Sequence, residues 1–145
     1  MANTNYLKNA VETFIRNQLE QEYGVAFTAR TLQLTTGGKH EFDAVSSDGH
    51  IVTAIKTASG KTARGKNPSG KIKDVEAELY YLLLIQAPIR QLILTSEEFY
   101  KIMVQRLKGR LANGIELRLI ILPHDMQEQV TLIQQAASKE ILGPD

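Results

Sequence analysis

The chain contains no cysteine and no tryptophan among its 145 residues. Without cysteine it has no disulfide, no thiolate metal site and no cysteine nucleophile, which fits a cytoplasmic protein. Its longest apolar run, residues 79–85, is far too short to span a bilayer, so we expect no membrane partner. The first residues lack the charged and apolar regions of a secretory signal. Together these absences predict a cytoplasmic protein.

Apolar residues make up 43% of the chain and charged residues 23%, as in ordinary globular proteins. The length predicts a single domain over residues 1–145. The net charge of +1 argues against a protein that coats nucleic acid with its whole surface, but the charges are unevenly placed. Residues 56–73 contain six basic residues and no acid, whereas the remainder contains 11 basic and 16 acidic residues.

Small, polar and basic residues dominate the segment 58–73, and this composition predicts an exposed loop. A cluster of cations binds phosphate groups with little regard to sequence, so nucleic acid is the partner that the loop indicates. The candidate binding residues are Lys61, Arg64, Lys66, Lys71 and Lys73.

Apolar periodicity and turn residues predict nine elements. We expect helices over residues 4–22, 74–86, 96–112 and 123–140, and strands over 25–35, 39–46, 50–57, 91–95 and 115–122. Thr95 and Glu98 have the spacing of a capping box for the third helix. The order αβββαβαβα predicts an α/β fold, with a mixed central sheet flanked by helices on both faces.

The hairpin from His40 to Lys56 contains the main candidate functional residues. Because side chains alternate along a strand, Glu41, Asp43 and Val45 are expected on one face of the first strand. Ala54 and Lys56 are expected to share a face of the next strand. Paired across the turn, Asp43 and Lys56 converge, so that a carboxylate able to bind Mg²⁺ lies beside an ammonium able to stabilise a phosphate.

These residues resemble the PD-(D/E)XK nuclease superfamily, whose restriction-endonuclease-like fold has an αβββαβ core. The family places a glutamate on the first helix, an aspartate on the second strand and an acid-x-lysine on the third. Glu12, Asp43 and Lys56 occupy these places here. The resemblance implies an Mg²⁺-dependent (or Mn²⁺-dependent) endonuclease acting on DNA or RNA, and such proteins are often homodimers.

The chain departs from the family at the acid of the acid-x-lysine motif, where it has Ala54. Some members carry that acid on the following helix, which here offers Asp74, Glu76 and Glu78, and Glu41 is another substitute. The alternative is a catalytically inactive relative that binds nucleic acid or a protein partner.

Structural roles compete with each functional one. Glu12 has the spacing of a helix pair with Arg16, and Asp43 is placed for a salt bridge with Lys56. The segments 60–66 and 65–71 have the Gly-x-x-x-x-Gly-Lys spacing of a nucleotide-binding loop. Both lack the following Ser or Thr that would hold Mg²⁺, so nucleotide binding is the weakest of the hypotheses.

Overall fold

The computed structural model describes residues 2–59, 65 and 67–142, with the backbone alone at residues 2–4 and 137–142. The helices are α1 (Ala2–Tyr23), α2 (Ser69–Leu83), α3 (Glu97–Leu107) and α4 (His124–Leu142). The strands are β1 (Phe27–Gln33), β2 (Lys39–Ser46), β3 (Ile51–Lys56), β4 (Ile89–Leu94) and β5 (Ile115–Leu119). The expected order αβββαβαβα is confirmed.

The predicted start of α2 and the predicted cap of α3 are wrong. Helix α2 begins at Ser69, directly after Pro68, so the last part of the expected loop is helical. Proline at a helix start costs nothing, because the first amides have no partner within the helix. Helix α3 is capped by Ser96, whose hydroxyl accepts a hydrogen bond from the Phe99 N–H at 3.2 Å, and not by Thr95.

The five strands form one mixed sheet in the order β1-β2-β3-β4-β5. The pairs β1–β2 and β2–β3 are antiparallel, whereas β3–β4 and β4–β5 are parallel. A tight turn with Gly49 at φ 76° joins β2 to β3, a geometry that glycine adopts without strain. The parallel pairs instead need crossovers, which α2 and α3 provide.

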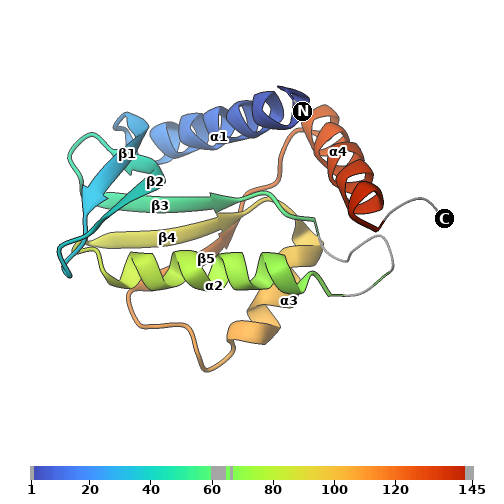
Figure 1. Ribbon diagram of the computed structural model, residues 1–145. Helices are drawn as coiled ribbons and strands as arrows, with labels where there is room; N and C mark the ends of the chain where they lie inside the picture. The colour runs from blue at the N-terminus through green and yellow to red at the C-terminus, as the bar shows by residue number, and fades with distance from the viewer. Residues whose placement is uncertain (1, 60–64, 66, 143–145) are drawn as a thin grey trace.

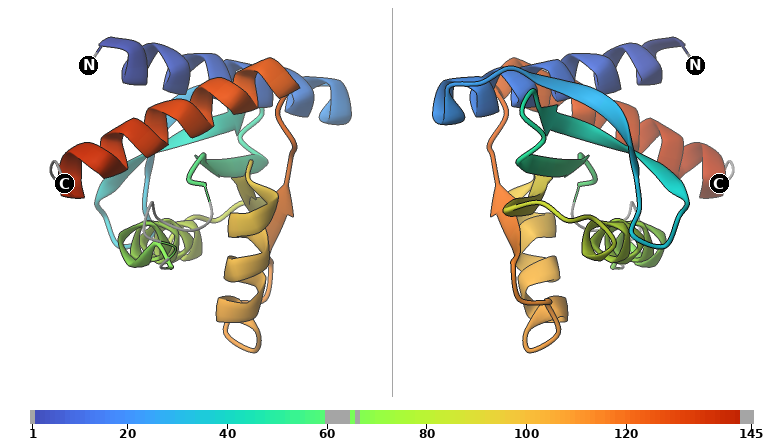
Figure 2. Two further views of the ribbon diagram at one scale, coloured as in Figure 1. Left: turned by 90° about the vertical axis from the view of Figure 1, so that its right-hand side faces the viewer. Right: turned by 90° about the vertical axis from the view of Figure 1, so that its left-hand side faces the viewer.

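Helices cover both faces of the sheet, as Figures 1 and 2 show: α1 and α4 lie on one side, and α2 and α3 on the other. Each side has its own apolar core. Strand β3 supplies both, because Val52 and Ala54 pack toward α2 and α3 while Ile51 and Ile55 pack toward α1 and α4. The expected alternation along β3 is therefore confirmed. No helix in the described part of the chain combines the length and the hydrophobicity that crossing a membrane requires.

Strand β2 contains a bulge at the position of the predicted site. Thr28 pairs with Val45 and Arg30 with Phe42, so β2 advances three residues while β1 advances two. The extra residue reverses the alternation. Phe42 and Val45 consequently lie in the same core, whereas Ala44 lies in the other. The prediction that Val45 shares a face with Glu41 and Asp43 is wrong for this reason.

The sheet forks next to the bulge. Strands β2 and β3 pair at Ala44–Thr53 and Val45–Val52. Beyond these pairs, β2 stays with β1 as far as Lys39, while β3 stays with β4 as far as Lys56. The two halves of the sheet therefore separate after Ala44, and the gap between them is where polar side chains from both halves meet.

Introducing an acid at position 54 is expected to destabilise the fold. Ala54 is fully buried among apolar side chains, so Ala54→Glu would both overfill the core and bury a carboxylate. We expect a loss of at least about 3 kcal/mol in the free energy of unfolding, measured with urea. Ala77→Glu, at an exposed position of α2, is the control and should change the free energy by less than about 0.5 kcal/mol. Equal stability of the two variants would mean that side chain 54 reaches solvent.

Candidate functional site

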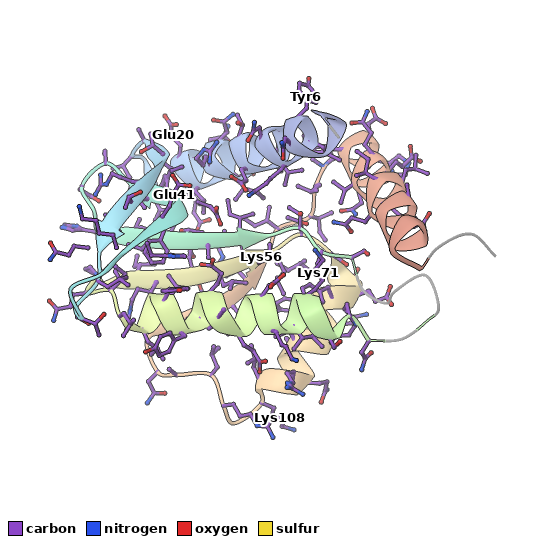
Figure 3. The ribbon with its side chains drawn as sticks, viewed as in Figure 1. Tyr6, Glu20, Glu41, Lys56, Lys71 and Lys108 are labelled. Atoms are coloured by element: carbon purple, nitrogen blue, oxygen red, sulfur yellow. The ribbon has the colours of Figure 1, made fainter. Side chains whose placement is uncertain are left out.

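A cleft of about 360 Å³ opens at the fork of the sheet. Its described lining comes from every helix and from β2 and β3, and comprises Lys8, Glu12, Glu41, Asp43, Ile55, Lys56, Thr57, Ala58, Lys71, Asp74, Glu78, Phe99 and Gln134. Five of these residues are acidic and three are lysines. Figure 3 shows Lys56 at the end of β3 and Lys71 at the beginning of α2, on the same side of the molecule.

Asp43 lies half-buried at the bulge, and hydrogen bonds from β3 and α1 fix its side chain and its backbone. Its carboxylate oxygen Oδ2 accepts a hydrogen bond from the Ile55 N–H at 2.8 Å. Its backbone carbonyl accepts one from Arg16 Nη1 of α1 at 2.9 Å. Burial raises the pKa of Asp43 and the charge of Glu78 adds to the rise, while the Ile55 hydrogen bond and Lys56 oppose it.

Glu12 reaches the same cleft from α1 and is only 8% exposed. Its carboxylate lies 3.7 Å from Arg16 Nη1 and 3.9 Å from Lys8 Nζ, so the expected helix pair with Arg16 is present. Burial raises the pKa of Glu12, and the nearby charge of Asp43 raises it further. Glu12 and Asp43 are thus two partly desolvated carboxylates that repel each other.

The structure separates the four acids that the sequence offered as substitutes for an acid at position 54. Glu41, Asp74 and Glu78 line the cleft. Glu76 does not, and its carboxylate instead lies 3.4 Å from Arg106 Nε of α3. Of the three in the cleft, Glu78 is the one whose charge raises the pKa of Asp43 most.

Among the described residues, only some of the basic ones that the sequence suggested as phosphate-binding lie in the cleft. Lys56 lines the cleft at the end of β3, and Lys71 lines it from the first turn of α2. Lys73 lies exposed on α2. Lys61, Arg64 and Lys66 lie outside the described residues.

Gln134 of α4 is a cleft residue that the sequence did not reveal. Its side-chain amide donates to the Thr57 carbonyl at 2.7 Å, and its amide oxygen accepts from the Ser59 N–H at 2.8 Å. Gln134 thereby satisfies the backbone that directly follows Lys56, as a neighbouring strand would. Nothing in the sequence sets Gln134 apart from the other glutamines of the helix.

The chain has no significant match among protein-family models, curated proteins or solved structures. What the cleft can do must therefore follow from its own chemistry. Across the described residues, no group of three or more His, Asp or Glu side chains is already placed to hold a metal ion. The cleft does bring carboxylates and lysines together at one end of the sheet, which is an arrangement suited to a phosphate accompanied by a cation.

Asp43→Asn is expected to stabilise the protein at neutral pH. Because the pKa of Asp43 is raised on folding, the folded state binds the proton more tightly, and stability falls as pH rises from about 3.8 through the folded-state pKa. Asparagine keeps an acceptor for the Ile55 N–H but removes the charge. We expect a gain of roughly 1 kcal/mol at pH 7, or about 3 °C in Tm, which shrinks toward pH 4.

The control is Asp48→Asn at the exposed turn. Hydrogen bonds from the Ser46 hydroxyl and the His50 N–H lower the pKa of Asp48, so its charge stabilises the fold at neutral pH. This variant should therefore lose stability at pH 7. If Asp43→Asn also lowers Tm at pH 7, Asp43 serves the fold as a structural ion pair.

Proposed function

We propose that the chain is a PD-(D/E)XK-type phosphodiesterase with a restriction-endonuclease-like fold, and that it cleaves DNA or RNA with the help of a divalent cation. The observation that carries the proposal is the meeting of Glu12, Asp43 and Lys56 in one cleft at the fork of the sheet. They come from the first helix, the second strand and the third strand, which are the elements that hold the corresponding residues in the family.

The donors in the cleft fit magnesium shared between the protein and a substrate. Mg²⁺ is commonly bound by one or two carboxylates, with water and phosphate oxygens completing its octahedral shell. Asp43 and Glu78 would be the two carboxylates, and their repulsion is part of the reason that the pKa of Asp43 is raised. A bound ion would neutralise phosphate charge and lower the pKa of its bound water.

The side chains around these carboxylates have separable roles. Lys56 at the end of β3 and Lys71 in the first turn of α2 both line the cleft and would hold phosphate oxygens as the charge on them grows. The Ile55 N–H and Arg16 prevent the Asp43 carboxylate from turning away, because one binds its side chain and the other its backbone. Gln134 fixes the backbone directly after Lys56, so that the side chain of Lys56 starts from a held position.

A second function, nucleic-acid binding without cleavage, is favoured by one observation. Ala54 is sealed into the apolar core at the position where the family has an acid. If Glu78 does not replace that acid, the lysines of the cleft would still attract phosphates, but no water would be activated.

Cleavage assays distinguish the two functions. Supercoiled plasmid, single-stranded DNA and single-stranded RNA are each incubated with the protein and Mg²⁺ or Mn²⁺. We expect the parent to cut at least one of these, and Asp43→Ala and Lys56→Ala each to lower the rate by about 100-fold or more. Lys101→Ala is the matched control, because Lys101 pairs with Glu97 on α3 outside the cleft.

The possible results have distinct meanings. Cleavage that survives both Asp43→Ala and Lys56→Ala would place the chemistry elsewhere. Salt-dependent binding of the same nucleic acids without cutting would support the inactive relative.

A further inference from the structure

His40 joins β2 to α2 by contacts that involve both packing and hydrogen bonding. Its ring stacks on Tyr81 of α2 with centroids 3.8 Å apart and planes 8° apart. The rings of His40 and Phe42 make a T-shaped contact, with centroids 4.8 Å apart and planes at 77°. His40 Nε2 lies 3.2 Å from Glu78 Oε2. His40 therefore holds the carboxylate of α2 whose charge helps to raise the pKa of Asp43.

Glu78 lies on the same side of the sheet as Ala54, the position at which the nuclease family has an acid. Ala54 belongs to the core on the α2 side of the sheet, as do Val75 and Leu79 of that helix. Glu78 precedes Leu79 on α2 and lines the cleft. Its carboxylate therefore enters the cleft from the α2 side of the sheet, which is also the side toward which the Ala54 side chain points. Helix α2 thus brings a carboxylate into the cleft, although side chain 54 lies in the core beside it.

A carboxylate in this place needs a partner that fixes its direction. Glutamate has three rotatable side-chain bonds, and ordering them costs free energy that a single hydrogen bond offsets. Carboxylates that bind metals are themselves usually held by such outer partners. Among the described residues, His40 is the hydrogen-bond partner of Glu78, and both side chains are largely shielded, at 20% and 18% exposure.

We propose that His40 is a positioning residue, which directs the Glu78 carboxylate toward Asp43 so that the two share a divalent cation. The proposal rests on the metal site of the proposed function, but it does not require that the site cleave anything. His40 itself lies outside the cleft lining and touches neither cation nor substrate.

Two substitutions separate positioning from packing. His40→Phe keeps an aromatic ring to stack on Tyr81 but cannot bond to Glu78. His40→Gln loses the ring but can place an amide N–H near the position of Nε2. The measurement is calorimetric titration of the full chain with Mn²⁺ alone, accompanied by thermal unfolding of each variant.

We expect His40→Phe to weaken Mn²⁺ binding about tenfold or more while Tm stays near that of the parent. His40→Gln should bind Mn²⁺ nearly as well as the parent despite a lower Tm. Glu78→Gln should weaken binding at least as much as His40→Phe, and combining the two should add little, because they remove the same interaction. Glu76→Gln is the matched control and should not change Mn²⁺ binding, because Glu76 faces Arg106 outside the cleft.

Unchanged Mn²⁺ affinity in His40→Phe would overturn the proposal and leave the metal site standing. A parent that does not bind Mn²⁺ would overturn the proposal together with the metal site. A parent that binds Mn²⁺ in this His40-dependent way, yet cuts no nucleic acid, would support the proposal and overturn only the nuclease.

Discussion

The hydrogen bond from the Ile55 N–H to the Asp43 carboxylate occupies the point where the sheet divides, and the candidate site depends on it. Past the Ala44–Thr53 pair, β3 has lost its β2 backbone partner. An amide left without a partner in this half-buried place would destabilise the fold. The carboxylate satisfies it at 2.8 Å and is itself fixed in direction. One contact thus ends the pairing of β2 with β3 and sets the orientation of the acid at the base of the cleft.

The charges around this contact are arranged at a cost in stability. Burial and neighbouring acids raise the pKa of both Asp43 and Glu12, so neither carboxylate lies where its ionised form is most stable. Residues held in this way are common at sites that await a cation or a proton, although structural networks also produce them. Lys8, Lys56 and Lys71 compensate only partly, because the described lining has five acids to three lysines. The cleft as a whole is therefore better suited to a ligand that brings positive charge with it.

The sequence predicted secondary-structure elements well where turn residues and apolar periodicity are pronounced. The bounds of β2 were predicted correctly, since an Asp-Gly turn and alternating residues define that hairpin. The face of Val45 was predicted wrongly, because the bulge beside Asp43 depends on pairing with β1 and on the Arg16 contact, both distant in sequence. Glu12, Asp43 and Lys56 were placed through a resemblance of pattern and order. Gln134 bonds to the backbone of Thr57 and Ser59, and His40 bonds to Glu78 of α2. Only the folded chain brings these groups near one another, and no sequence pattern marks either residue.

The cleft draws its walls from almost the whole length of the chain, from Lys8 in α1 to Gln134 in α4. Contacts so far apart in sequence form late, because the loop between them must first be closed. On a ribosome, the hairpin with Asp43 and Lys56 would emerge long before the helix that anchors the backbone beside that lysine. The cleft is thus completed only when the last helix docks, and a fragment that ends before α4 would contain Asp43 and Lys56 without the cleft that encloses them.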